Sequence, residues 1–264
     1  MPDTPQALFF DTFGTVVEWR SCVTSALTTI AQQVLRDPHR DIPTDVRQRA
    51  SALDESDWLG VAEDWRRSYG VFTRTFDASK PFISVDQHHH TALQDLLRQR
   101  GIRDLFSDDE LWELTLAWHR LDPWPDSARG LGLLNSRFTT STLSNGNVSL
   151  LQDLKEHGSL PFAHLVSSEN FGAYKPSPKV YLGAAKLLGL DPSQCVLVAA
   201  HLNDLEAAKS CGFQTVYVER EKEEARSPEQ VAQAKKEGFV DMWVDLNTGG
   251  FIEVARRFGI EERP

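Results

Sequence analysis

The stretch ALFFDTFGTVVEWR, residues 7–20, decides the fold expected for this chain. Its apolar residues 8–10 end on a single acid, Asp11, and a turn with Gly14 follows. Such a short apolar run is typical of a strand that is buried on both faces of a parallel sheet. Ligands of open parallel sheets bind outside the carboxyl ends of the strands. The acid at the end of this strand is therefore a candidate functional residue.

Composition excludes several classes of protein. The chain has 264 residues, of which 41% are hydrophobic, and a net charge of −10. This length allows one good core and a second module. The acidic balance argues against a nucleic-acid partner, and we find neither a membrane-spanning apolar run nor a secretory signal. Three widely spaced cysteines without a CxxC pair favour a reducing compartment, so we expect a soluble, cytoplasmic protein.

The two halves of the sequence differ in periodicity. Apolar residues recur at helical spacing in residues 21–37, 46–76, 91–101 and 108–121. Short β-rich runs then alternate with helical stretches, and these runs lie at 138–144, 164–168, 195–200, 214–219 and 242–246. This alternation predicts an α/β fold with a Rossmann-like parallel sheet. We expect a discontinuous core of residues 1–18 and 125–264, with residues 19–124 inserted as an all-helical cap.

Polar residues follow the other predicted strands at their carboxyl ends. They are Ser144 and Asn145 after the second strand, Lys175 beyond the third, and His201, Asn203 and Asp204 after the fourth. Singly, each has an ordinary structural explanation: an aspartate can cap a turn, and Asp204 can cap the next helix. Together, at one edge of a sheet, they predict an active site.

Asp11 has the chemistry of a covalent nucleophile, which forms an ester or acyl phosphate that water then cleaves. Burial alone would raise its pKa, and the ammonium of Lys175 beside it would keep it ionised. Thr15 can donate a hydrogen bond to a carboxylate oxygen, and the backbone N–H groups of residues 13–15 can hydrogen-bond the site. Ser144 and Asn145, at the start of a helix, offer donors to an anionic substrate group.

These motifs resemble those of the haloacid dehalogenase superfamily. They are D-x-F-G-T at 11–15, S-N-G at 144–146, K-P at 175–176 and the acid at 204. Within the superfamily the chain resembles the L-2-haloacid dehalogenases (type II). The likeness extends to AWHRLDPWPDS at 117–127 and KPSPKVYLGAAKLLGL at 175–190, and is weaker through residues 30–110.

The resemblance implies a mechanism. The Asp11 carboxylate would attack C2 of a short 2-haloalkanoic acid with inversion, and halide would leave. Water would then hydrolyse the ester at the Asp11 carbonyl to give the 2-hydroxy acid. Lys175 would orient the nucleophile, and Thr15 and Asp204 would support it and the water. A homodimer is also typical of the family.

The resemblance further implies residues that contact the substrate. These are Phe13, Ser144, Asn145, Tyr181, His201 and Asn203. An arginine of the cap would bind the halide or the carboxylate. Arg66 matches its place in VAEDWRRSYG, with Arg67 and Arg20 as the alternatives.

Phe13 decides between two chemistries. Phosphatases of the superfamily carry a second aspartate two residues after the nucleophile, where it protonates the leaving oxygen. Phenylalanine cannot donate a proton, and a departing halide needs none. We therefore favour dehalogenation without a cofactor over a Mg²⁺-dependent small-molecule phosphatase, in which Asp204 would help to hold the metal.

The segment VAAHLND departs from the family pattern. Ala199 and Ala200 replace serines, His201 replaces an asparagine, and Asn203 replaces a tryptophan. His201 could be a hydrogen-bond partner or base for the hydrolytic water, or could simply cap the next helix. These changes leave open a third possibility, a non-catalytic descendant that binds small acids.

Two further segments receive structural interpretations. Three adjacent histidines, residues 88–90, point in different directions on one backbone, so we expect a polar helix start rather than a metal site. The charged run EREKEEARSPEQ, residues 219–230, is interpreted as a solvated loop and helix start.

Overall fold

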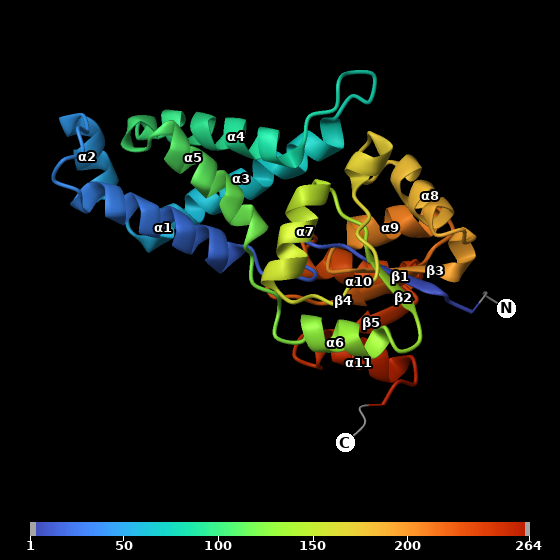
Figure 1. Ribbon diagram of the computed structural model, residues 1–264. Coiled ribbons are helices and arrows are strands. Elements are labelled where there is room, and N and C mark those ends of the chain that lie inside the picture. The colour runs from blue at the N-terminus through green and yellow to red at the C-terminus, as the bar shows by residue number, and fades with distance from the viewer. Residues whose placement is uncertain (1–3, 262–264) are drawn as a thin grey trace. The chain divides into compact units, whose positions relative to one another are not determined.

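The computed structural model describes residues 4–261 (Figure 1). The chain divides into two compact units. One contains the residues up to Glu18 and those from Asp122 onward, and the other runs from Trp19 to Leu121. The chain thus leaves the first unit after Glu18, as expected, and returns to it at Asp122, three residues before the expected residue 125.

The first unit is built on a five-stranded sheet in which all strand pairs are parallel. Its strands are β1 (Ala7–Phe10), β2 (Thr139–Thr142), β3 (Cys195–Ala199), β4 (Gln214–Val218) and β5 (Met242–Val244). Their order is β2-β1-β3-β4-β5. The predicted α/β class and parallel sheet are confirmed. In this order the strand connections change direction between β1 and β3, which is where doubly wound sheets bind ligands.

Both faces of the sheet are buried, which explains why β1 is apolar throughout. Phe9 packs on one face, with its ring centroid 5.8 Å from that of Phe213. Helices α8 (Pro178–Leu187), α9 (Leu202–Ser210) and α10 (Pro228–Glu237) supply the apolar side chains on that face. Phe10 points to the other face, where its ring centroid lies 5.0 Å from that of Phe251 in α11 (Gly250–Arg257). A half-exposed strand would alternate apolar and polar residues instead.

The strand predicted at residues 164–168 is wrong. These residues, all of them described, form only isolated parallel bridges, from His164 to Ser141 and from Ser167 to Ser144. A 3-10 helix, Ser168–Phe171, follows at once because Ser167 caps it. Lys175 therefore reaches the edge of the sheet from an irregular segment rather than from the end of a strand.

Figure 1 shows α6 (Ser127–Leu134) and α11 side by side below the sheet. Gly130 of α6 touches Phe251: a Cβ added at Gly130 would lie 2.3 Å from the Phe251 Cβ and 2.7 Å from its carbonyl carbon. The two helices can approach this closely only because residue 130 has no side chain.

Gly130→Ala should therefore destabilise the protein by about 1–3 kcal/mol, because the helices must separate. Gly132→Ala on the same helix is the matched control, since a Cβ there meets nothing within 4 Å. It should stabilise by about 0.5–1 kcal/mol through helix propensity. Urea unfolding of both variants measures the difference, and equal free energies of unfolding would contradict this packing.

The second unit is helical, as predicted. Its helices are α1 (Arg20–Arg36), α2 (Thr44–Ser51), α3 (Glu55–Thr75), α4 (Val85–Gln99) and α5 (Asp108–Thr115), with 3-10 segments at Arg103–Leu105 and Leu116–His119. Residues 46–76 have one continuous helical pattern but form two helices, because Asp54 starts a new one through a capping box with Asp57. No helix within residues 4–261 is both long and apolar enough to cross a membrane.

The three histidines lie inside α4. His89 is buried, with its ring centroid 4.5 Å from that of Trp118. Burial lowers its pKa well below the usual value, so it is neutral. His88 stacks on Phe72 and His90 stacks on Trp112. The side chains do diverge, but the expected polar helix start is wrong for His89, which belongs to an aromatic core.

Candidate active site

Asp11 stands directly after β1 at the carboxyl edge of the sheet and is 8% exposed. Its Oδ1 accepts a hydrogen bond from Lys175 Nζ at 2.9 Å. Its Oδ2 accepts from Thr15 Oγ1 at 2.9 Å and lies 3.0 Å from His201 Nδ1. Burial alone would raise the pKa of Asp11, but Lys175 and His201 outweigh it and keep the pKa well below the usual value. The carboxylate is therefore ionised at neutral pH and held by three side chains.

The turn after Asp11 is closed by its own backbone. The carbonyl of Thr12 accepts the N–H groups of Thr15, Val16 and Val17, and the Gly14 N–H donates to Val17. The N–H groups of Gly14 and Thr15 are thus used within the turn, and the expectation that they hydrogen-bond the site is wrong for these two. Gly14 has a φ of +79°, the left-handed region that favours glycine.

Lys175 joins two carboxylates. Its Nζ donates to Asp11 Oδ1 and, at 2.5 Å, to Asp204 Oδ2. Burial would lower the pKa of Lys175, but the two carboxylates raise it above its usual value, so the ammonium stays charged. The Tyr181 hydroxyl donates to Asp204 Oδ1 at 2.5 Å. Asp11, Lys175, Asp204 and Tyr181 form one connected buried network.

Asn145 fixes the backbone at Lys175. Its Oδ1 accepts from the Lys175 N–H at 2.7 Å and from Ser168 Oγ at 2.6 Å, and its Nδ2 donates to the Lys175 carbonyl at 3.3 Å. Neighbouring Ser144 is fully buried, and its Oγ accepts from the Gly146 N–H. The S-N-G motif was expected to bind substrate, and in this structure its amide instead positions the lysine.

His201 occupies the N-cap position of α9, but its side chain makes no capping hydrogen bond. The ring instead lies between two carboxyl groups. Nδ1 faces Asp11 Oδ2 at 3.0 Å, and Nε2 lies 3.5 Å from Glu223 Oε2. Asp204 is within the first turn of α9 and is not its cap. His201 is therefore not a side-chain cap of α9, and the structure favours the other interpretation, in which its ring belongs to the site around Asp11.

Sequence reasoning missed the segment after β4. The charged pattern predicts a solvated loop for Glu223, Glu224 and Arg226, yet all three contact the segment that contains His201. Glu224 Oε2 accepts the Leu202 N–H at 2.8 Å, and Arg226 Nη2 donates to Asn203 Oδ1 at 2.7 Å. The sequence does carry a signal for this segment: it follows the end of a parallel strand, and ligands of parallel sheets bind at those ends.

Arg220 anchors the same segment to the turn after Asp11. Its Nε donates to the Thr15 carbonyl at 3.1 Å. Its Nη1 and Nη2 donate to the two carboxylate oxygens of Asp126 at 2.6 and 2.8 Å, a planar two-bond match that suits arginine. Thr15 is also tied to β3, because its Oγ1 accepts the Ala200 N–H.

Asn203 lies apart from this network. It is exposed and accepts hydrogen bonds from Arg226. The expectation that Asn203 joins the residues around Asp11 is therefore wrong. Phe13 is buried beside Gly146, where an added Cβ would lie 3.4 Å from its ring.

The donor set does not fit a magnesium ion. Both oxygens of Asp11 and both of Asp204 already face hydrogen-bonding side chains, and Lys175 places its positive charge between the two carboxylates. Phe13 offers no oxygen. Within residues 4–261, no group of three or more His, Cys, Asp or Glu side chains is placed to hold a metal.

The arginines considered for anion binding lie in the second unit. Arg66 of α3 has its guanidinium carbon 4.7 Å from the Tyr69 ring centroid and 5.9 Å from that of Trp19. Arg20 lies over the same Trp19 at 4.3 Å. Arg67 is 69% exposed and pairs with Asp64. Arg66 and Arg20 thus gather on one aromatic ring, whereas Arg67 is a surface residue.

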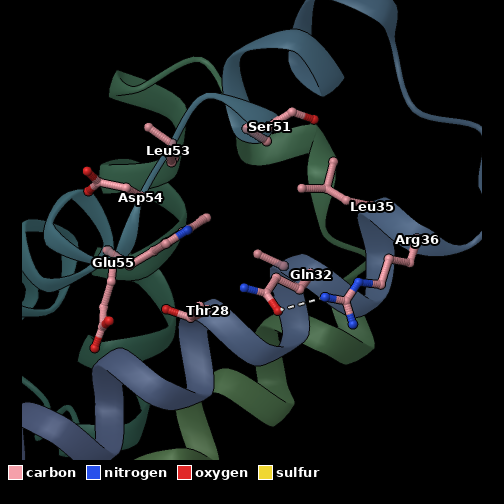
Figure 2. Close-up of a pocket in the computed structure, with 11 residues that line it drawn as sticks. Thr28, Gln32, Leu35, Arg36, Ser51, Leu53, Asp54 and Glu55 are labelled. Atoms are coloured by element: carbon pink, nitrogen blue, oxygen red, sulfur yellow. Dashed lines mark hydrogen bonds between the residues drawn. The ribbon is translucent and has the colours of Figure 1, made fainter.

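The second unit also has a surface cavity of about 420 Å³ between α1, α2 and α3 (Figure 2). Figure 2 shows Gln32 accepting a hydrogen bond from Arg36 along one wall. Asp54 and Glu55 stand on the opposite side, at the start of α3. None of the predicted site residues lines this cavity.

Known proteins resemble this chain over most of its length. A family model described as haloacid dehalogenase-like hydrolase matches residues 5–212. (S)-2-haloacid dehalogenase 1 of Pseudomonas sp. (strain CBS-3) is 36% identical over 208 residues, which cover 76% of this chain and 85% of that protein. A solved structure of a defluorinating L-2-haloacid dehalogenase is 31% identical, has a TM-score of 0.79, and covers 97% of this chain and 99% of its own. Another L-2-haloacid dehalogenase structure is 29% identical, with a TM-score of 0.78 and coverage of 98% and 100%. The chain belongs to the haloacid dehalogenase-like hydrolase family.

Proposed function

We propose that this protein hydrolyses short 2-haloalkanoic acids to 2-hydroxy acids and halide through an ester on Asp11. The observation that carries the proposal is the buried Asp11 carboxylate, kept ionised by Lys175, with Phe13 in the place of a general acid. The names of its relatives, (S)-2- and L-2-haloacid dehalogenases, support the same substrate class.

The first step is displacement at carbon. An Asp11 oxygen attacks C2 of the substrate, the C2–halogen bond breaks, and the halide leaves with the bonding electrons. Lys175 and Thr15 hold the carboxylate in one orientation, so that attack comes from one side and inverts C2. Asp204 accepts a second hydrogen bond from Lys175, and Tyr181 holds Asp204 in place.

The second step is hydrolysis of the ester. Water attacks Cγ of Asp11, the Cγ–O bond to the former substrate breaks, and the 2-hydroxy acid leaves with a proton. The carboxylate of Asp11 is restored, so one chain turns over repeatedly. Arg66 remains our candidate for the group that binds the substrate carboxylate or halide.

The phosphatase alternative has little support in the site. A phosphatase of this superfamily needs an acid to protonate the leaving oxygen and carboxylate oxygens to bind Mg²⁺. Phe13 cannot supply the proton, and Lys175 occupies the position between the two carboxylates. We therefore propose a reaction without a metal cofactor.

The three cysteines support our expectation of a reducing, cytoplasmic location. Within residues 4–261, no disulfide joins Cys22, Cys195 or Cys211. Burial raises the pKa of Cys195 to about 12, which keeps that thiol protonated and unreactive.

Halide release tests the proposal directly. L- and D-2-chloropropionate and chloroacetate are incubated with the protein in EDTA, and chloride is measured beside p-nitrophenyl phosphate hydrolysis with Mg²⁺. We expect chloride from chloroacetate and from one 2-chloropropionate enantiomer, with inverted lactate as the product of the latter. Phosphate release that requires Mg²⁺, with no chloride, would overturn the proposal.

A further inference from the structure

His201 lies between two carboxyl groups that come from different parts of the chain. Asp11 Oδ2 is 3.0 Å from its Nδ1, and Glu223 Oε2 is 3.5 Å from its Nε2. The Glu223 side chain is only 5% exposed, and that of His201 is 24% exposed. A carboxylate is seldom buried this deeply without a function or a partner. Glu223 therefore stands where it can act on the far side of the imidazole.

The turn after Asp11 is shaped to admit Glu223. A Cβ added at Gly14 would lie 1.9 Å from Glu223 Oε2 and 2.5 Å from its carboxyl carbon. The carboxyl group thus packs directly against the Gly14 backbone, which any other residue would cover. Gly14 has a second constraint, its positive φ, so two independent features restrict this position to glycine.

The segment that contains Glu223 is anchored on both sides. Arg220 binds Asp126 and the Thr15 carbonyl before it, and Glu224 accepts the Leu202 N–H after it. These contacts hold the segment against the turn after Asp11 and against the start of α9. Contacts made by the residues on both sides of Glu223 in the sequence therefore fix its position beside His201.

We propose that Glu223 and His201 act as a dyad that removes the proton from the water that hydrolyses the Asp11 ester. The inference rests on the proposed function and deepens it by assigning the base of the second step. His201 is the residue that contacts the reacting water, and Glu223 is a positioning residue that acts through His201.

The charge of Asp11 determines when His201 can act as a base. In the free enzyme both ring nitrogens face a carboxylate oxygen, an arrangement that the two N–H groups of an imidazolium satisfy. Ester formation removes the negative charge of Asp11, so the Nδ1 proton loses its anionic acceptor and passes to solvent. Glu223 retains the proton on Nε2, and the Nδ1 lone pair then faces the ester.

The atoms balance through the hydrolytic step. Water gives one proton to His201 Nδ1 while its oxygen bonds to Cγ of Asp11. The Cγ–O bond to the substrate then breaks, and the departing oxygen takes the proton from Nδ1. Asp11, left as a carboxylic acid, returns its proton to His201. One proton has gone to solvent for each halide released, as the overall hydrolysis requires.

Asp204 is less well placed for this task. Its Oδ1 accepts from Tyr181 and its Oδ2 accepts from Lys175, so both oxygens are engaged with donors. Two carboxyl groups face His201, those of Asp11 and Glu223, and Thr15 and Lys175 hydrogen-bond to Asp11.

The dyad is tested with Glu223→Gln, which keeps the size of the side chain and removes its charge. Glu221→Gln is the matched control, since Glu221 is 67% exposed. Rapid-quench assays with chloroacetate measure the first-turnover chloride burst and the steady-state rate, and mass spectrometry measures ester on the Asp11 peptide. The wild-type protein is assayed before the variants and must release chloride. If it does not, the proposed function is overturned together with the dyad.

For Glu223→Gln we expect the burst to be retained, kcat to fall roughly 10²-fold, KM to fall with it, and ester to accumulate. Glu223→Asp, which keeps the charge, should recover part of the rate. Glu223→Gln turnover equal to that of Glu221→Gln, with no ester, would overturn the dyad and leave the proposed function intact. Loss of the chloride burst in Glu223→Gln would also overturn the dyad, because Glu223 would then act before ester hydrolysis.

His201→Gln is the second variant, and it makes the test independent of how Glu223→Gln folds. It should also release one chloride per active site and accumulate ester. If the two residues act as a unit, the double variant is no slower than His201→Gln alone. Multiplied effects in the double variant would show two separate roles and overturn the dyad.

Discussion

We expect the Asp11→Asn variant to lose roughly 10⁴- to 10⁶-fold in kcat with 2-haloacids, the range expected when a covalent catalyst is removed. The amide has no negative charge with which to displace a halide. Its size is unchanged, and Lys175 keeps Asp204 as a partner, so the fold should persist. Chloride release over hours measures the residual rate, and circular dichroism with thermal unfolding verifies the fold.

Asp45→Asn is the matched control for this substitution. Asp45 lies in α2 and its side chain is 63% exposed. The control should retain wild-type activity. A rate for Asp11→Asn within tenfold of wild type, in protein freshly prepared to limit deamidation, would exclude an ester on Asp11 and with it the proposed mechanism.

Lys175→Met has the second largest expected effect, and it acts on both catalysis and stability. The substitution removes the cation between Asp11 and Asp204 and leaves two buried carboxylates without it. Removing one partner of a buried ion pair typically destabilises a protein by about 3–5 kcal/mol. The variant should also lose roughly 10³-fold or more in kcat, because Asp11 loses the cation that orients its Oδ1 and favours its ionised form.

The loss of stability in Lys175→Met should depend on pH. In the wild type the pKa of Asp11 is lowered by folding, so its contribution to stability is present above the unfolded pKa of about 4 and is lost as the pH falls. Burial already raises the pKa of Asp204 in the wild type, and loss of Lys175 raises the pKa of both carboxyl groups. Ionising them therefore costs more in the folded variant, whose stability falls as the pH rises through their pKa values.

Urea unfolding at about pH 5 and about pH 7.5 should therefore show a larger difference between variant and wild type at the higher pH. Lys236→Met, at an exposed position of α10, is the control for loss of a surface charge. A pH-independent difference would mean that Lys175 does not compensate buried charge.

The sequence predicted those parts of the fold that depend on local pattern. Residues 7–10 are apolar throughout because both faces of β1 are covered, and that pattern was sufficient to place Asp11. Local pattern failed where long-range contacts decide. The β-rich residues 164–168 form single bridges to Ser141 of β2 and to Ser144 beyond it, because Ser167 caps a 3-10 helix.

The candidate site was also predicted only where local sequence pattern identifies its residues. Motif spacing identified Asp11, Lys175 and Asp204, and the structure connects them. Motif spacing does not identify Glu223: the place of its segment after β4 points to the site, but one glutamate in a run of charged residues looks solvated. Its burial depends on the missing side chain of Gly14, more than two hundred residues away in sequence, and no local periodicity encodes such a contact.

The central position of β1 has a consequence for how the chain is made. β1 leaves the ribosome before either of its hydrogen-bonding neighbours, β2 (residues 139–142) and β3 (residues 195–199). Until both are synthesised, a fully apolar strand has an open edge that can pair with other chains. Sheet formation therefore waits for most of translation, and such non-local pairing folds slowly. Ribosome-bound chains that end before β3 are thus the species in which β1 is most exposed to aggregation.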